Sequence, residues 1–273
     1  SLKALIDFLT DPARGLLRAR LGVRLDEQAL VLDDREPADL GPLDRYAAGQ
    51  RLLDAALEGE PMLLARAELR ATGLLPLGTP GEVAVDALLP AVETIAAVAA
   101  PLREGARQAP LTLDLACGSV RLVGAVEDLW PQGRVVARYS RLGPDKLLAE
   151  WVRHLGMCCA EPDPGAGPPG VAPVEQSAAV GRSVSGEGVR HVRFGPVPEA
   201  AEHLETLVGL WQAGQVAPLP LLPGSAMAYV AALRDGVDAE KALGKARTVL
   251  SGARYKGYGD WGPYAAAVWG DTD

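Results

Sequence analysis

The spacing of apolar residues in the first hundred positions predicts a series of helices. Leu2, Leu5 and Leu9 fall on one face of a helix, because residues three or four positions apart share a helical face. Asp11-Pro12 follows, and it is typical of an N-cap with proline at the first helical position. The helix that begins at Pro12 is expected to reach about residue 20, and two more are expected at residues 46–57 and 61–72. A Gly- and Pro-rich loop at 73–81 is followed by a long apolar helix that is expected to end at about residue 103.

The spacing changes from helical to alternating after residue 110. Leucines at 111, 113 and 115 alternate with polar or small residues, which is typical of a strand with one buried face. Residues 117–119 and 131–133 have the composition of tight turns. Three short strands near 111–115, 120–124 and 135–139 are therefore expected to form an antiparallel meander.

The second half of the chain predicts one more hairpin among helices. A helix is expected from Pro144 to about Cys159, and residues 161–173 are expected to form a Pro- and Gly-rich surface loop. Residues 178–184 and 189–194 flank Ser-Gly-Glu-Gly and predict a β-hairpin. Helices are then expected at about 199–214, 225–234, 238–251 and 260–269.

This order of elements predicts a mixed α/β fold with a small mixed sheet flanked by many helices, not a repeating βαβ array. A hydrophobic content of 48% in 273 residues is enough for one large domain with a sizeable core. We divide it into an N-terminal helical part at 1–82, a core at 83–195, and C-terminal helices at 196–273 that pack on the same domain.

Hydropathy and cysteine content indicate a protein of the reducing cytoplasm. The longest apolar stretch, residues 83–102, contains Asp86, Pro90 and Glu93, so we expect a buried or amphipathic helix and no membrane contact. The start of the chain lacks the features of a secretory signal, and Ser1 in place of Met suggests a piece of a longer protein. The three cysteines, two of them adjacent, do not suit a disulfide framework.

Charge is distributed unevenly along the chain, whose net charge is -8. Residues 1–24 carry a net +3, residues 26–60 a net -7 and residues 241–256 a net +5. Three solvated faces would explain this pattern. Alternatively, the two basic segments face DNA phosphates, which bind clustered cations, and the acidic segment faces solvent or a partner protein.

The common catalytic and cofactor motifs are absent from the sequence. The three histidines are scattered, no HExxH or zinc-type Cys/His spacing occurs, and Gly244-Lys245 is followed by Ala246 where a phosphate-binding loop needs Ser or Thr. We therefore expect no cofactor and no metal.

The order helix, meander, helix, strand resembles the core of PD-(D/E)XK nucleases, whose Mg²⁺ needs carboxylate ligands and a nearby lysine. Gly124 to Glu127 resembles the family's acidic element on the second strand. Arg138 stands where the third strand would carry a metal-binding Asp, and Ser140 stands where it would carry the Lys. Leu147 and Trp151 occupy the places of the family's helical Gln and Tyr. This resemblance implies a degenerate restriction-endonuclease-like core without catalytic residues, in which Arg138 fills the vacated cation site and Asp128 points away from Glu127, as expected for neighbours on a strand.

Nearly the whole chain resembles the C-terminal domain of RecC, the gamma subunit of exodeoxyribonuclease V. Eight short segments carry this resemblance. They are Asp11-Pro12 and residues 20–23, Glu36-Pro37 and residues 43–46, and residues 73–82, 114–117, 151–155 and 217–223. It implies a non-catalytic subunit that acts with RecB-like and RecD-like partners on duplex or forked DNA, in an ATP-dependent helicase–nuclease of double-strand-break repair and recombination. It also implies that the domain helps to separate the strands where DNA enters.

Three hypotheses about this chain remain open from the sequence. The first is a DNA-guiding scaffold without catalysis, the second an active nuclease with relocated groups such as Glu127 and Asp114, and the third a pure protein-interaction module. Arginines and lysines near the third strand either contact phosphates or neutralise neighbouring acids, and the loop at 161–173 and the hairpin at 178–194 are candidates for subunit contacts or strand separation. The DNA-binding candidates are Arg14, Arg18, Arg134, Arg141, Lys241 and Lys245, and Arg138, Lys146 and Arg153 lie near them in sequence.

Overall fold

The computed structural model describes residues 1–25, 40–160, 176–252 and 261–270. Several expectations lie outside these ranges. They are the first part of the acidic segment, the Pro- and Gly-rich loop at 161–173, the basic residues Arg254 and Lys256, and the start of the last predicted helix.

The predicted N-terminal helices are confirmed, with shifted starts for two of them; the helix expected at residues 46–57 begins at Pro42. Asp11 caps the second helix by accepting a hydrogen bond from the backbone N–H of Arg14 at 3.0 Å. The long apolar helix begins at Thr79, inside the predicted loop, because Pro80 fits the first turn of a helix. The elements are α1 (Leu2–Thr10), α2 (Pro12–Arg14), the π-helical turn η1 (Gly15–Arg20), α3 (Pro42–Glu58), α4 (Met62–Ala71), α5 (Thr79–Ala99) and the 3-10 turn η2 (Ala100–Arg103).

The predicted meander is wrong, because its strands divide between two sheets. β1 (Leu111–Cys117) and β2 (Val120–Val126) form an antiparallel pair of their own. The chain then turns at Asp128, whose φ of 62° lies in the left-handed region and breaks the extended conformation. The second sheet has the order β3-β4-β5-β6, with β3 at Leu129–Trp130, β4 at Gly133–Arg141, β5 at Ser177–Arg182 and β6 at Val189–Phe194.

The second sheet is mixed, as predicted. β4 runs parallel to β5, and β5 pairs with β6 as the predicted antiparallel hairpin. The later helices are confirmed within the described ranges. They are α6 (Pro144–Cys159), α7 (Ala200–Gly214), α8 (Pro223–Arg234), α9 (Ala239–Leu250) and α10 (Pro263–Trp269).

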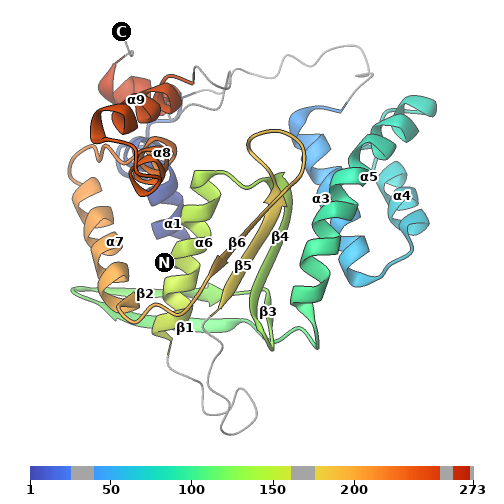
Figure 1. The fold of residues 1–273 in the computed structure, drawn as a ribbon, viewed down its shortest axis with the longest axis horizontal. Coiled ribbons are helices and arrows are strands. Elements are labelled where there is room, and N and C mark those ends of the chain that lie inside the picture. Colours follow the sequence, from blue (N-terminus) through green and yellow to red (C-terminus); the bar gives the residue numbers. More distant parts are fainter. Residues whose placement is uncertain (26–39, 161–175, 253–260, 271–273) are drawn as a thin grey trace, which may run out of the picture.

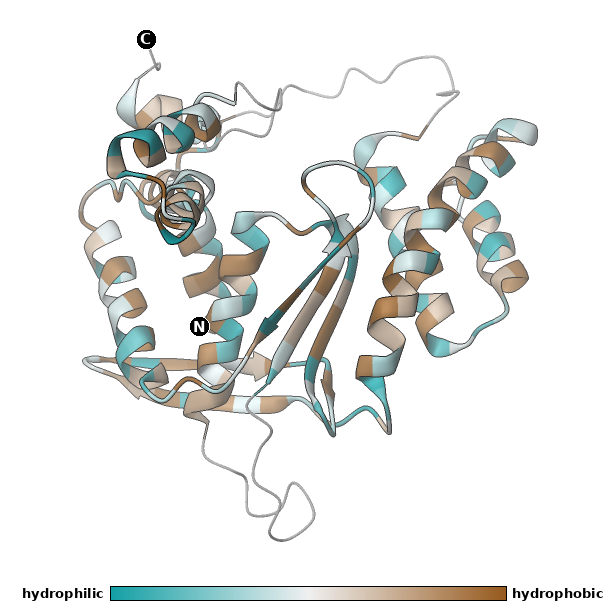
Figure 2. Ribbon diagram, viewed as in Figure 1, coloured by the Kyte–Doolittle hydropathy of each residue, from teal (hydrophilic) through white to brown (hydrophobic). Residues whose placement is uncertain are grey.

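Helices cover both faces of the β3–β6 sheet (Figure 1). α3 and α5 lie on one face and α6 on the other, while the β1–β2 hairpin lies along the ends of α6 and α7. Hydrophobic residues, brown in Figure 2, occur in the strands of this sheet and in the helices beside it, and those that are buried form two main clusters between the layers. The mixed α/β class is therefore confirmed, and the nuclease-like core remains a proposal.

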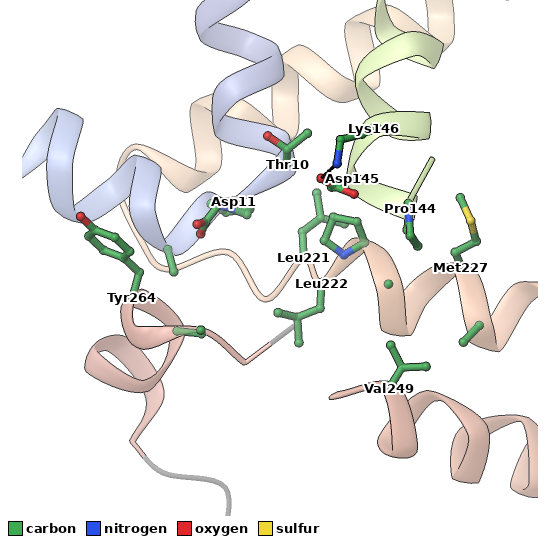
Figure 3. A pocket seen from close by; sticks show the side chains of 18 of the residues that line it. Thr10, Asp11, Pro144, Asp145, Lys146, Leu221, Leu222, Met227, Val249 and Tyr264 are labelled. Atoms are coloured by element: carbon green, nitrogen blue, oxygen red, sulfur yellow. Dashed lines mark ion pairs between the residues drawn. The ribbon is translucent and has the colours of Figure 1, made fainter. Parts of the chain in front are cut away.

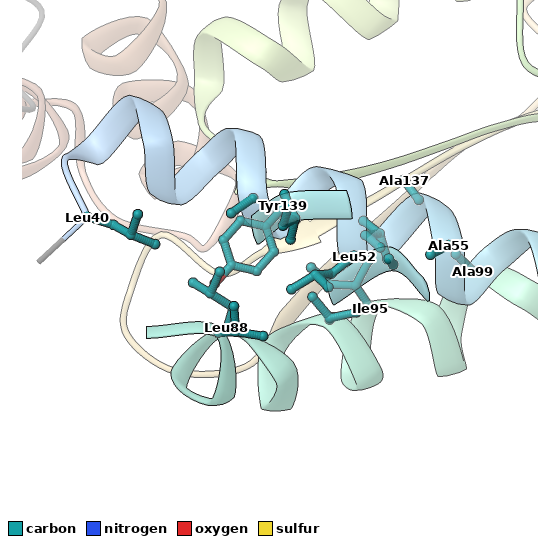
Figure 4. Close-up of a cluster of buried hydrophobic side chains, with 14 of the residues drawn as sticks. Leu40, Leu52, Ala55, Leu88, Ile95, Ala99, Ala137 and Tyr139 are labelled. Carbon is teal, nitrogen blue, oxygen red and sulfur yellow. The ribbon is translucent and has the colours of Figure 1, made fainter. Parts of the chain in front are cut away.

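One hydrophobic core lies between α3, α5 and the sheet (Figure 4). Leu52 and Ile95 are fully buried there beside Ala137 and Tyr139 of β4. Gly49 allows the close approach, because an added Cβ at this position would overlap the Tyr139 ring. A second core joins α1, the β1–β2 hairpin, α6 and α7. Each core draws on more than one of the three predicted segments, whose division stays a prediction.

The segment Thr79–Arg103 is long and apolar enough to cross a membrane, with 28% of its most apolar window buried. Its inward face contributes Val85, Leu88, Val92 and Ile95 to the first core. Its other face carries acids, and Asp86 and Glu82 form ion pairs with arginines of α4. The segment therefore has the pattern expected of an amphipathic core helix.

Candidate nucleic-acid interface

Alternation along β4 sends its side chains to two environments. Ala137 and Tyr139 point into the core beneath α3 and α5. Val136, Arg138 and Ser140 lie on the opposite face and line a hollow between β4 and α6. Arg138 and Ser140 are two residues apart on the strand and therefore share this face.

The hollow, which we call the β4–α6 pocket, has a volume of about 400 Å³. α6 contributes Lys146, Glu150 and Arg153, whose spacing of i, i+4 and i+7 puts them on one helical face. The remaining lining residues are Tyr46, Val136, Leu142, Ala149, Ala179 and Val180. The pocket therefore gathers charged groups from a strand and a helix above an apolar floor.

A buried ion pair lies at the inner side of the pocket, where Glu150 lines the pocket and Arg134 lies behind it. Arg134 of β4 donates to the carboxylate of Glu150, and their side chains are 3% and 9% exposed. The Nε of Arg134 also donates to the backbone carbonyl of Glu127 at 3.0 Å. Arg153 donates to the other oxygen of Glu150 at 3.2 Å and to the carbonyl of Ala149. Glu150 is thus held between two guanidinium groups.

Neighbouring positive charges affect the pKa of Arg153. Burial lowers the pKa of Arg153, and the charges of Arg134 and Arg138 lower it further. The carboxylates of Glu150 and Asp7 act in the opposite direction. A guanidinium nevertheless stays protonated in proteins, so the pocket retains its positive charge.

Glu127, the carboxylate expected near Arg138, does not line the pocket. It is exposed just beyond the end of β2, and no ion pair within the described part of the chain joins its side chain to Arg138. Asp128 follows it at the left-handed turn and pairs with Arg107 at 2.8 Å. The strand alternation that we expected for Glu127 and Asp128 does not apply, because neither residue belongs to a strand.

The two helical positions compared with the family's Gln and Tyr lie in packed cores. Leu147 is buried with Leu142 and Ala179, and Trp151 packs against His154 and Phe194. Their neighbours on the helix face the pocket instead. Sequence reasoning missed Glu150; the signal that would have found it is the charged stripe at 146, 150 and 153.

Carboxylates elsewhere do not gather into a metal site. Asp114 lies on the outer face of β1, where Arg121 donates to it and lowers its pKa. In the described ranges no three His, Cys, Asp or Glu side chains are grouped so that they could hold a metal ion. The relocated pair of Asp114 and Glu127 is therefore not supported by this geometry.

The DNA-binding candidates occupy three different environments. Arg134 is buried against Glu150 and cannot reach a DNA backbone, which corrects that expectation. Arg14 is exposed on α2, and Arg18 is half-buried on η1. Lys241 and Lys245 are exposed on α9, where Lys241 pairs with Asp238 at 3.0 Å.

Arg141 is half-buried at the end of β4 and lines a second cavity of about 610 Å³ (Figure 3). This cavity lies between α2, the start of α6 and the C-terminal helices. Residues of α2 and α9 both line it, so these two helices, which carry basic residues, lie at the same end of the molecule. Leu222, Met227, Val249 and Tyr264 form much of its wall. Such an apolar lining offers few partners for a charged backbone.

The β4–α6 pocket has the chemistry of an oxyanion site. Arg138, Lys146 and Arg153 supply charged donors, and Ser140 and Tyr46 supply hydroxyl groups. Guanidinium and ammonium groups bind phosphate and carboxylate oxygens through charge-assisted hydrogen bonds. A divalent cation would instead be repelled by the three positive charges. The one carboxylate among the described lining residues that could bind it, Glu150, is already paired with arginines.

Comparisons with known proteins agree with the sequence resemblance. Residues 1–234 match the family described as RecC C-terminal domain. The chain is 30% identical over 273 residues to RecBCD enzyme subunit RecC of Mycobacterium tuberculosis (strain CDC 1551 / Oshkosh), which covers 99% of the chain and 23% of that protein.

Two further relatives carry the same description. The identity is 30% over 246 residues with RecBCD enzyme subunit RecC of Mycolicibacterium smegmatis, covering 89% of the chain and 22% of the relative. It is 28% over 257 residues with the Escherichia coli (strain K12) subunit, covering 90% and 21%. The chain therefore spans less than a quarter of the length of these curated relatives.

Proposed function

The chain belongs to the RecC C-terminal domain family, and from this membership we propose that it is a DNA-guiding and scaffolding domain without catalysis. It acts in a RecBCD-type complex with RecB-like and RecD-like subunits in the cytoplasm. The complex is an ATP-dependent helicase–nuclease that processes duplex or forked DNA in double-strand-break repair and recombination.

The observation that carries this proposal is the composition of the β4–α6 pocket. If the resemblance to PD-(D/E)XK nucleases is right, Arg138 and Ser140 have replaced the metal-binding acid and the lysine on β4. Glu150 is the only acid among the described residues that line the pocket, and Arg134 and Arg153 already neutralise it. Mg²⁺ in such sites is bound through carboxylates, so this arrangement favours guiding over cutting.

The β5–β6 hairpin is the part that we propose to help separate strands or to contact a partner subunit. Its tip, residues 183–188, connects β5 to β6 and projects beyond the end of the sheet (Figure 1). Gly186 and Gly188 have φ values of 133° and 106°, which favour glycine. Because these two positions carry no side chain, the tip is narrow there, and a narrow tip can enter between the two strands of a DNA fork.

A cleavage assay tests the absence of catalysis. The full-length protein without its partner subunits is incubated with linear single- and double-stranded DNA and Mg²⁺ or Mn²⁺. We expect no cleavage above a buffer control. Metal-dependent cleavage that is lost in Glu127→Ala or Glu150→Gln would show that the protein is an active nuclease.

Binding to a forked duplex separates DNA guiding from a pure protein-interaction role. We expect the wild-type affinity to fall as salt rises, because phosphate contacts release counterions. Charge reversal at Arg14 and Arg18, or at Lys241 and Lys245, should weaken binding and flatten this dependence. If the complete complex shows no binding to the fork at low salt, the domain is an interaction module.

A further inference from the structure

We propose that the β4–α6 pocket binds a phosphate group of a DNA strand, held by Arg138, Lys146 and Arg153. This assignment rests on the proposed function, because it takes DNA as the source of the phosphate. It adds a specific place on the domain, between a strand and a helix, where the backbone of the DNA is held.

The first argument is an excess of positive charge that local acids do not neutralise. Three cations line the pocket, whereas Glu150 is the only acid among its described lining residues. The charge of Glu150 is already matched by Arg134, which lies behind the lining. Asp145 forms an ion pair with Lys146 at 3.8 Å, a separation too long for a hydrogen bond, so the N–H donors of Lys146 stay available. Neutralisation of neighbouring acids therefore does not explain Arg138, and the pocket keeps a net positive charge.

The second argument is that all three cations keep donors available. Arg138 is exposed, and within the described ranges it has no hydrogen-bond or ion-pair partner. The side chain of Lys146 is 43% exposed. Arg153 is 29% exposed and uses only its Nη1 atom for Glu150 and Ala149. An oxyanion that enters the pocket can accept from all three groups.

The third argument concerns shape and rigidity. The pocket is concave, and its volume of about 400 Å³ lies within the range of small-molecule sites, roughly 300–1,000 Å³. A phosphate with its neighbouring sugars can enter such a hollow. Arg153 is fixed by Glu150, which is in turn fixed by Arg134, so part of the donor set is oriented before the ligand arrives. Preorganised donors lose less entropy on binding.

The fourth argument is that binding relieves repulsion. Arg153 lies close enough to Arg134 and Arg138 for their positive charges to lower its pKa. A phosphate carries negative charge at neutral pH, so its arrival offsets this repulsion. The pocket is therefore complementary to an anion in both charge and hydrogen bonding.

The test uses the full-length protein with Arg138→Ala and Lys146→Ala combined. Arg153 is left intact, because its loss would disturb Glu150. The matched control combines Arg70→Ala and Arg121→Ala, which removes the same charge from exposed sites outside the pocket. A second variant, Arg138→Lys with Lys146→Arg, keeps the charge in place. Circular dichroism and thermal unfolding check that each variant is folded.

Two ligands are measured on each variant. Pyrophosphate binding is followed by isothermal titration calorimetry, and binding of a labelled forked duplex with single-stranded arms is followed by fluorescence anisotropy at several salt concentrations. We expect the pocket variant to lose pyrophosphate binding and to bind the fork roughly tenfold more weakly, a change of about 1.4 kcal/mol. The slope of log K against log salt should fall by about 0.7–0.9 for each phosphate that the variant no longer neutralises. The control and charge-retaining variants should resemble the wild type.

The outcomes separate this proposal from the function on which it rests. Loss of pyrophosphate binding with unchanged or absent fork binding would mean that the pocket takes a free phosphorylated ligand, and the assignment to DNA would be wrong. Equal pyrophosphate binding by the wild type and the pocket variant, or no binding by either, overturns the phosphate site whatever the DNA result. Fork binding that depends only on α2 and α9 would leave the guiding role intact without this pocket.

Discussion

Arg134 of β4 and Glu150 of α6 form an ion pair that lies buried between the sheet and the helix. The pair connects Glu150 of the pocket to the turn after β2, because Arg134 also donates to the carbonyl of Glu127. Arg153 contacts the same carboxylate from the pocket side. One carboxylate therefore organises two arginines from different elements.

Breaking this pair on one side should destabilise the protein strongly. Arg134→Met leaves the Glu150 carboxylate buried with only Arg153 as a partner, and removal of one member of a buried pair costs about 3–5 kcal/mol. The free energy of unfolding from urea titration measures this loss. The double variant Arg134→Met/Glu150→Leu should recover much of the stability, since it buries no charge without a partner. A double variant less stable than Arg134→Met would contradict this view of the pair.

Gly49 of α3 should not tolerate a larger residue. An added Cβ would overlap the ring of Tyr139, and overpacking of a core costs typically about 1–3 kcal/mol. Gly209→Ala in α7 is the matched control, because nothing lies within 4 Å of its added Cβ. That control should gain up to about 1 kcal/mol. Thermal and urea unfolding compare the two variants.

A double variant separates overlap from helix propensity at Gly49. Tyr139→Leu removes the ring that the new methyl group would meet. We therefore expect Gly49→Ala to cost less in the Tyr139→Leu background than in the wild type, since residues in contact are not additive. Equal costs in both backgrounds would place the strain elsewhere.

The side chain of Gln50 replaces a neighbouring strand along the edge of β4. Its Oε1 accepts from the backbone N–H of Tyr139 at 2.9 Å, and its Nε2 donates to the carbonyl of Ala137 at 3.4 Å. Gln50→Leu leaves these backbone groups without their partner, at a cost of about 1–3 kcal/mol. We expect lower stability and faster hydrogen exchange at the Tyr139 amide.

Gln212→Leu on α7 is the control for this experiment. Gln212 is exposed and makes a 3.3 Å hydrogen bond to Ser119, so its replacement should change the stability little. Slow exchange at Tyr139 in Gln50→Leu would show that another group satisfies the strand edge.

The N-cap Asp11 should make stability depend on pH. Burial raises the pKa of Asp11 above its usual 3.8, although its hydrogen bond from Arg14 opposes the shift. The folded state therefore holds the proton more firmly than the unfolded state. Ionised Asp11 costs stability above the raised pKa, and this cost disappears as pH falls through that pKa toward 3.8.

Asp11→Asn tests this sign, because Asn caps a helix as well as Asp does and carries no charge. We expect the variant to be more stable than the wild type at neutral pH, with a smaller difference near pH 3.8. Asp11→Ala removes the cap and should cost about 0.5–2 kcal/mol at low pH. Urea unfolding across this pH range measures both variants. A difference between Asn and Asp that grows toward acid pH is incompatible with the proposed cost of burial.

The sequence by itself determined the elements whose signals are local. Apolar spacing and Pro144 at the first turn predicted α6 with its bounds at Pro144 and Cys159, and the Ser-Gly-Glu-Gly segment predicted the β5–β6 hairpin. Alternation also predicted the third strand at 135–139, which lies within β4. These features depend on neighbours within a few residues, which a sequence displays directly.

Tertiary structure alone decided which strands pair and which face of α6 meets the sheet. β4 pairs with the distant β5 instead of β2, because the left-handed turn at Asp128 separates the two sheets. Leu147 and Trp151 of α6 occupy apolar cores, which fixes the rotation of α6 about its axis. This rotation places Lys146, Glu150 and Arg153 in the same pocket as Arg138. The rotation of a helix about its axis follows from the burial of its largest apolar face, and the groups that it must meet come from segments far apart in the chain.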